Sequence, residues 1–115
     1  MTINKKEKDL LLNEILGYIE DIEDIFNRLR VKEFYANINK ITDRIVDLLA
    51  HISNGLKKII VHYPNLNNKI KEKSAIDYIE LGKTIEEGYW IHNYKNIWNA
   101  AKGTNFIKKV LFELD

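Results

Sequence analysis

The sequence predicts an all-α protein, an antiparallel bundle of three long helices with a short fourth helix at the C-terminus. Only one proline and five glycines interrupt the 115 residues. No stretch alternates apolar and polar residues for long enough to form a sheet, and apolar side chains recur at helical spacing over most of the chain. The content of 45% hydrophobic and 30% charged residues is typical of a folded globular protein, and the length suits a single domain over residues 1–115.

The first helix is expected from about Lys6 to Arg30, with Asn4 or Thr2 as its N-cap. Its apolar positions are three or four residues apart and form one seam, which consists of Leu12, Ile15, Ile19, Ile22, Phe26 and Leu29. The opposite face is mostly acidic and contains Asp24 and Arg28 at the spacing of a helical ion pair. We interpret this face as solvent-exposed.

The second helix is expected from about Lys32 to His62 and has the longest periodic pattern in the chain. Its seam consists of Phe34, Ile38, Ile41, Ile45, Leu48, Ile52, Leu56, Ile59 and Tyr63. Residues 30–34 contain no strong helix breaker, so a turn and a bent continuous helix both remain open there. Pro64 ends the second helix, because the residue before a proline avoids the α region. The chain is expected to reverse at this point.

The third helix is expected from about Asn68 to Ala101. It has two apolar stripes in different registers, namely Ile70, Tyr78, Leu81 and Ile85, then Ile91, Tyr94, Trp98 and Ala101. Gly82 and Gly88 lie at or near the shift, and a glycine inside a helix costs about 1 kcal/mol relative to alanine. They indicate close backbone packing or a bend. Gly103 is expected to end this helix and Thr104 to cap the fourth, whose apolar residues are Phe106, Ile107, Val110, Leu111 and Leu114.

The composition narrows the function classes. A formal net charge of +1 provides no general field for nucleic acid or a membrane, so we expect no membrane partner and disfavour nucleic acid. The absence of cysteine excludes disulfides and thiolate metal sites. The N-terminal residues lack the apolar run of a signal peptide, so a cytoplasmic location is expected. The excess of 15 Lys over three Arg favours a bacterial, AT-rich coding origin.

The familiar motifs of catalysis and metal binding are missing. The residues three positions before the histidines are Leu48, Ile59 and Tyr89, so the Glu-x-x-His pair of bundle metal sites does not occur. There is no phosphate-binding loop and no nucleophile elbow. We therefore expect a non-enzymatic protein with no catalytic residue, no metal ligand and no cofactor, and infer no small-molecule substrate.

One pair of residues suggests an alternative, enzymatic function. Arg44 and His51 are separated by six residues, a spacing that resembles the Arg-x(4–6)-His element of HEPN ribonucleases, which include toxins of toxin–antitoxin systems. The stretch 60–63 resembles the His-Tyr end of that element. The resemblance implies that His51 acts as general base on a ribose 2′-hydroxyl and that Arg44 steadies the phosphate.

Aromatic residues gather late in the third predicted helix, and we predict a partner-binding surface there. Tyr89 and Trp90 are consecutive and point about 100° apart around a helix axis, so one helix cannot bury all of these side chains on one face. Exposed Trp and Tyr are enriched at binding hot spots. The predicted site residues are Tyr89, Trp90, Tyr94 and Trp98. The alternative is that the fourth helix covers them as part of the core.

The stretch 74–88 contains Asp77, Tyr78, Leu81 and an acidic pair that begins at Glu86. In this it resembles the last long helix of small uncharacterised bacterial helical-bundle proteins. Their overall plan, and that of this chain, is similar to flagellar export chaperones, whose bundles clasp an amphipathic helix of a secreted subunit. The resemblance implies a chaperone-like binder of another protein's helix.

These observations favour a cytoplasmic protein-interaction module, either a monomer or a homodimer. In this hypothesis the aromatic surface engages an amphipathic helix or a second copy of the chain. A third function class is a structural coiled-coil assembly, in which the seams of the first two helices would need a partner to bury them.

Overall fold

The computed structural model describes residues 4–29, 38–88 and 94–114. All regular structure in these ranges is helical, and its order is α1 (Lys5–Arg28), α3 (Ile38–Ile60), α4 (Leu66–Ser74), α5 (Tyr78–Glu86), α6 (Tyr94–Lys102) and α7 (Thr104–Phe112). The predicted all-α fold class is therefore confirmed. None of the helices in these ranges is long and apolar enough to cross a membrane.

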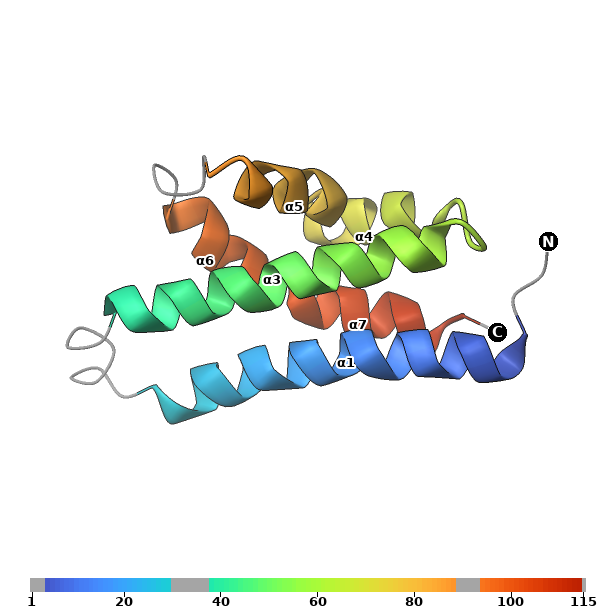
Figure 1. Ribbon diagram of the computed structural model, residues 1–115, viewed down its shortest axis with the longest axis horizontal. Coiled ribbons are helices and arrows are strands. Elements are labelled where there is room, and N and C mark those ends of the chain that lie inside the picture. The colour runs from blue at the N-terminus through green and yellow to red at the C-terminus, as the bar shows by residue number, and fades with distance from the viewer. Residues whose placement is uncertain (1–3, 30–37, 89–93, 115) are drawn as a thin grey trace.

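Helices α1 and α3 lie side by side and run in opposite directions along the molecule (Figure 1). Their predicted seams face the core, where the fully buried side chains include Ile15, Ile19, Ile22, Ile45, Leu48, Ile52, Leu56 and Ile59. Removing so much apolar surface from water is the main stabilising contribution to such a pair. The described seam residues are buried or half-buried by contacts within the chain.

Helix α1 begins and ends close to the predicted residues. The Asn4 side chain accepts a hydrogen bond of 2.9 Å from the Glu7 amide, which satisfies one of the free N–H groups at the helix start. The predicted ion pair between Asp24 and Arg28 is present at 3.1 Å. The connection to α3, where the sequence leaves a turn or a continuous helix open, lies outside the described residues.

The third helix, expected as one element from about Asn68 to Ala101, is instead divided into α4, α5 and α6. Helix α4 ends because Ala75 has a left-handed backbone with φ of 62°. The Ser74 hydroxyl accepts a hydrogen bond from the Ile76 amide and donates one to the Ile70 carbonyl, which stabilises the turn. Asp77 then caps α5 by accepting from the Glu80 amide at 3.1 Å.

The two glycines at the register shift have different roles. Gly82 is where α5 packs most closely on α3, since a Cβ atom at this position would overlap the side chain of Ser53. Gly88 has φ of 80°, a conformation that favours glycine, and lies just after α5 ends. The sequence predicted close packing or a bend for these residues; close packing occurs at Gly82, whereas at Gly88 the helix has already ended.

The final helix starts one residue differently from the expectation. Gly103 occupies the N-cap position of α7, and Thr104 is the first helical residue. The Thr104 hydroxyl donates a hydrogen bond of 2.9 Å to the Ala101 carbonyl oxygen instead of capping α7. Gly103 fits here because a Cβ atom would lie 2.6 Å from the buried Tyr78 hydroxyl.

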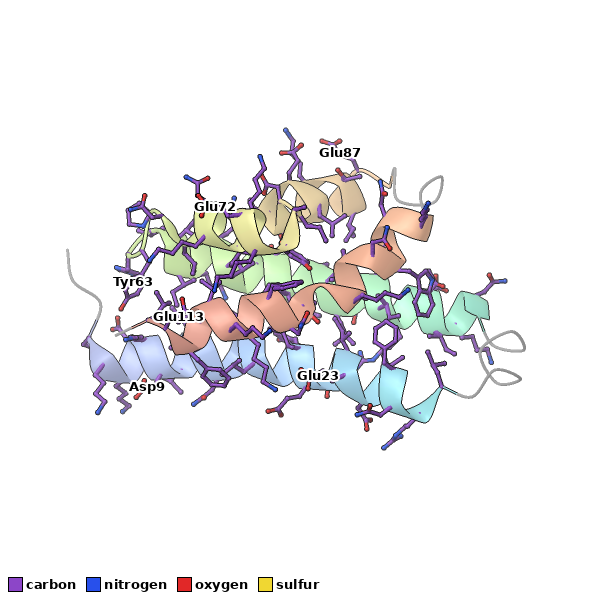
Figure 2. The ribbon with its side chains drawn as sticks, turned by 180° about the vertical axis from the view of Figure 1, so that it is seen from behind. Asp9, Glu23, Tyr63, Glu72, Glu87 and Glu113 are labelled. Carbon is purple, nitrogen blue, oxygen red and sulfur yellow. The ribbon has the colours of Figure 1, made fainter. Side chains whose placement is uncertain are left out.

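Helix α3 is the central element of the described structure. Helices α1, α5 and α6 all contact α3, while α7 contacts α1 and α4. Seen from behind, α6 and α7 lie in front of α3, and α5 lies above them with Glu87 at its end (Figure 2). This arrangement places both α5 and α6 on the same central helix.

Candidate functional site

Only part of the predicted aromatic site can be placed. Tyr89 and Trp90 lie outside the described residues. Tyr94 is the first residue of α6, and its side chain also lies outside the description. The partner-binding role of these three residues therefore stays a prediction.

Trp98 is described, and its contacts are with the protein itself. Its ring is half-buried and meets Phe26 of α1 edge to face, with ring centroids 5.7 Å apart. Its indole N–H donates a hydrogen bond of 3.2 Å to the hydroxyl of Thr42, a residue of α3 that is itself buried. Trp98 thus connects α6 to α1 and α3, and its predicted partner-binding role stays a prediction.

An open groove of about 720 Å³ is lined mainly by α5 and α6, with further residues from the α4–α5 connection and α7. We call it the α5–α6 groove. Its apolar lining includes the buried or half-buried residues Ile76, Leu81, Ala100, Gly103 and Phe106, together with the exposed Ala75. Its polar lining includes Asp77, Glu80, Thr84, Asn96, Asn99 and Lys102. Buried apolar groups with exposed polar groups beside them are typical of a binding groove.

The position of each wall follows from specific contacts. Gly82 holds α5 against α3 at Ser53, on a different side of the helix from the groove-lining Leu81 and Thr84. The Tyr78 hydroxyl donates a hydrogen bond of 2.7 Å to the Ala100 carbonyl of α6, and this bond links the two walls. Both contacts are buried, so the separation of the walls is set by the core.

The carboxylate of Asp77, at the start of α5, is stabilised in its ionised form by neighbouring groups. Burial raises its pKa, but hydrogen bonds from the Glu80 amide and the Asn67 side chain and the positive charge of Lys71 outweigh this effect, so the pKa is lowered overall. The Asn67 amide donates to the Asp77 carboxylate at 3.2 Å. Asp77 therefore remains ionised at neutral pH, and its main partners belong to the protein itself.

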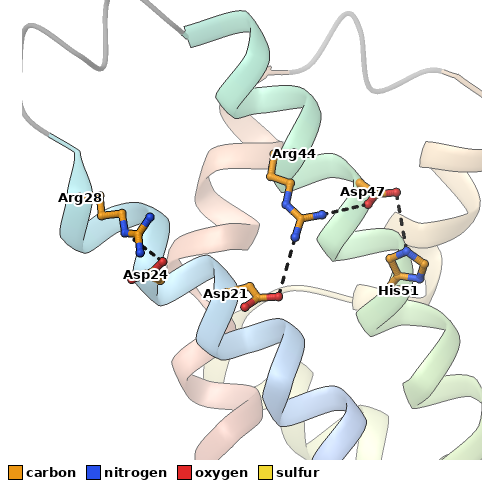
Figure 3. Close-up of polar contacts among 6 residues, drawn as sticks. All are labelled: Asp21, Asp24, Arg28, Arg44, Asp47 and His51. Carbon is orange, nitrogen blue, oxygen red and sulfur yellow. Dashed lines mark hydrogen bonds and ion pairs between the residues drawn. The ribbon is translucent and has the colours of Figure 1, made fainter.

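The proposed ribonuclease pair, Arg44 and His51, lies away from the groove, on the exposed surface of α3 beside α1 (Figure 3). Arg44 approaches Asp47 at 3.4 Å and Asp21 of α1 at 3.8 Å. His51 approaches the other oxygen of Asp47 at 3.7 Å and stacks on the Tyr18 ring, with centroids 4.9 Å apart. The side chains of Arg44 and His51 are 56% and 49% exposed, respectively. The structure brings the pair together through Asp47, a residue that sequence reasoning did not include.

This arrangement forms a polar bridge between two helices. The Arg44 guanidinium already has two carboxylates beside it, so an approaching phosphate would have to displace them or be repelled by them. Within the described ranges, no group of three or more His, Asp or Glu side chains is placed to hold a metal ion.

Sequence reasoning missed the α5–α6 groove. The available signal was Asp77 followed three residues later by Glu80, since this spacing is typical of a helix start. A helix that starts at residue 78 places Leu81 and Thr84 on one face, and that face now lines the groove.

Comparisons with protein-family models, with curated proteins and with solved structures find no match to this chain.

Proposed function

We propose that this protein is a non-enzymatic interaction module that binds an amphipathic helix of another protein in the α5–α6 groove. The observation that supports this function is the groove itself, about 720 Å³ of open space with an apolar lining and a polar rim. Grooves between helices commonly accept the apolar face of a partner helix. The described part of the chain has no sheet edge to which an extended peptide could add.

The structure also supports a different location for the binding surface from the one the sequence favours. Trp98, one of the predicted site residues, uses its indole N–H and its ring within the fold. The groove lies on another side of α6, next to Asn96 and Asn99. In this proposal the described part of the binding surface is the groove, and Trp98 supports its α6 wall.

A selection from displayed peptides tests this proposal. The library would contain peptides of about 14 residues, a length that forms about four helical turns. We expect the recovered peptides to carry apolar residues at spacings of three and four and to bind the wild-type protein. Thr84→Trp places a large side chain in the groove and should weaken their binding about tenfold or more.

The matched control is Asn54→Trp, because Asn54 is exposed on α3 and does not line the groove. Both variants should keep the wild-type melting temperature within the small range of surface substitutions. Peptides that bind both variants as well as the wild type would contradict a site in the groove. Light scattering of the free protein would separately reveal self-association.

The ribonuclease alternative has its own test. We expect wild-type protein and His51→Ala to give equal background cleavage of single-stranded RNA. The His51–Asp47 contact is exposed, so the substitution should also change the free energy of unfolding by less than about 1 kcal/mol. Cleavage by the wild type that His51→Ala abolishes would overturn the non-enzymatic proposal.

A further inference from the structure

The two walls of the α5–α6 groove carry opposite charges at their exposed edges. On α5, Glu80 is exposed and lines the groove, and Asp77 adds a second carboxylate on the same wall. On α6, the last residue, Lys102, is exposed and lines the groove from the other side. The remaining exposed lining residues of α6, Asn96 and Asn99, are neutral.

Among the described residues, the three charged side chains that line the groove differ in their partners. Asp77 is compensated by Asn67 and Lys71. Neither the Glu80 carboxylate nor the Lys102 ammonium forms an ion pair or side-chain hydrogen bond with any described residue. Within the described ranges, the groove thus has Glu80 on one edge and Lys102 on the other, and neither side chain forms an ion pair.

The length of the walls also limits how much of a partner helix can contact the groove. Helices α5 and α6 contain nine residues each, which corresponds to a wall of about 13 Å or about two and a half helical turns. The apolar lining between the walls includes Leu81, Ala100 and Phe106. An occupant of this length can place one narrow apolar stripe against that lining and one side chain on each flank.

From this arrangement we infer the charge pattern of the partner, an inference that rests on the proposed function. The partner is an amphipathic helix with a basic residue on the flank that meets Glu80 and an acidic residue on the flank that meets Lys102. Because the two edges have opposite charge, the pattern also determines which way the partner helix lies in the groove. Complementary rim charges contribute more to specificity and orientation than to affinity.

Charge-reversal variants test the inference with peptides recovered by the groove selection. We expect the recovered peptides to carry one basic and one acidic residue on opposite flanks of the apolar stripe. Glu80→Lys and Lys102→Glu should each weaken their binding about threefold or more, and the loss should shrink as salt is added. Glu20→Lys on α1 is the matched control for net charge and should leave binding unchanged.

The double variant Glu80→Lys with Lys102→Glu provides the decisive arm. It should bind the original peptides weakly and bind peptides with the two flank charges exchanged at least as well as the wild type binds the originals. Groove-dependent peptides without flank charges, or without sensitivity to both reversals, would overturn the inference and leave the proposed function standing. Recovery of no peptide that Thr84→Trp blocks would overturn the proposed function, and the inference with it.

Discussion

Gly82→Ala is expected to destabilise the protein and to disturb the α5–α6 groove. The added Cβ atom would overlap the side chain of Ser53, which is fully buried in α3, so α5 must move away from its neighbour. Overpacking of this kind costs about 1–3 kcal/mol. The better helix propensity of alanine offsets at most about 1 kcal/mol of this cost. Urea denaturation should therefore show a lower free energy of unfolding.

Gly17→Ala is the matched control, because Gly17 also lies inside a helix but has open space around its missing side chain. This variant should gain about 0.5–1 kcal/mol from helix propensity alone. The difference between the two variants measures the steric contact between α5 and α3. An equal stabilisation in both would show that α5 does not pack on Ser53 as described.

Tyr78→Ala is expected to have the largest effect of any substitution considered. Tyr78 is the largest fully buried side chain among the described residues, and truncating a buried aromatic residue costs about 3–5 kcal/mol. Tyr78→Phe keeps the ring and removes only the hydroxyl, so it should cost about 1 kcal/mol for the lost bond to Ala100. Thermal unfolding of both variants would separate ring packing from the hydrogen bond.

Tyr78 also makes stability depend on alkaline pH. Burial raises the pKa of its hydroxyl well above the ordinary value of about 10. An acid whose pKa is raised on folding contributes stability that is fully present below its unfolded pKa. That stability is lost as pH rises from about 10 toward the folded pKa. The stability advantage of the wild type over Tyr78→Phe should therefore shrink above about pH 10, and an advantage that stays constant would contradict the buried hydroxyl.

The helices with regular seams could be predicted from the sequence. In α1 and α3 every described seam residue is buried or half-buried, because a continuous apolar stripe needs only local spacing to determine which face turns inward. The predicted stop at Pro64 is likewise a local property of the backbone, and α3 ends at Ile60 just before it.

The division of the expected third helix was harder to predict. Ala75 adopts a left-handed backbone although alanine favours helix, and the Ser74 and Asp77 side chains stabilise that turn. The α5–α6 groove depends on contacts distant in sequence, such as the packing of Gly82 on Ser53. The local pattern indicated close packing or a bend at Gly82, but it could not identify Ser53 as the residue against which Gly82 packs.

The most direct test of a helix-binding groove is to map where a selected peptide binds. In a titration followed by NMR, the backbone amides of Leu81, Asn99 and Gly103 around the groove should shift in proportion to the bound fraction. The amide signals of Gly17 in α1 and His51 in α3, two residues that do not line the groove, should not shift. Shifts confined to residues of α1 and α3 outside the groove, with the groove amides unchanged, would contradict the proposed function.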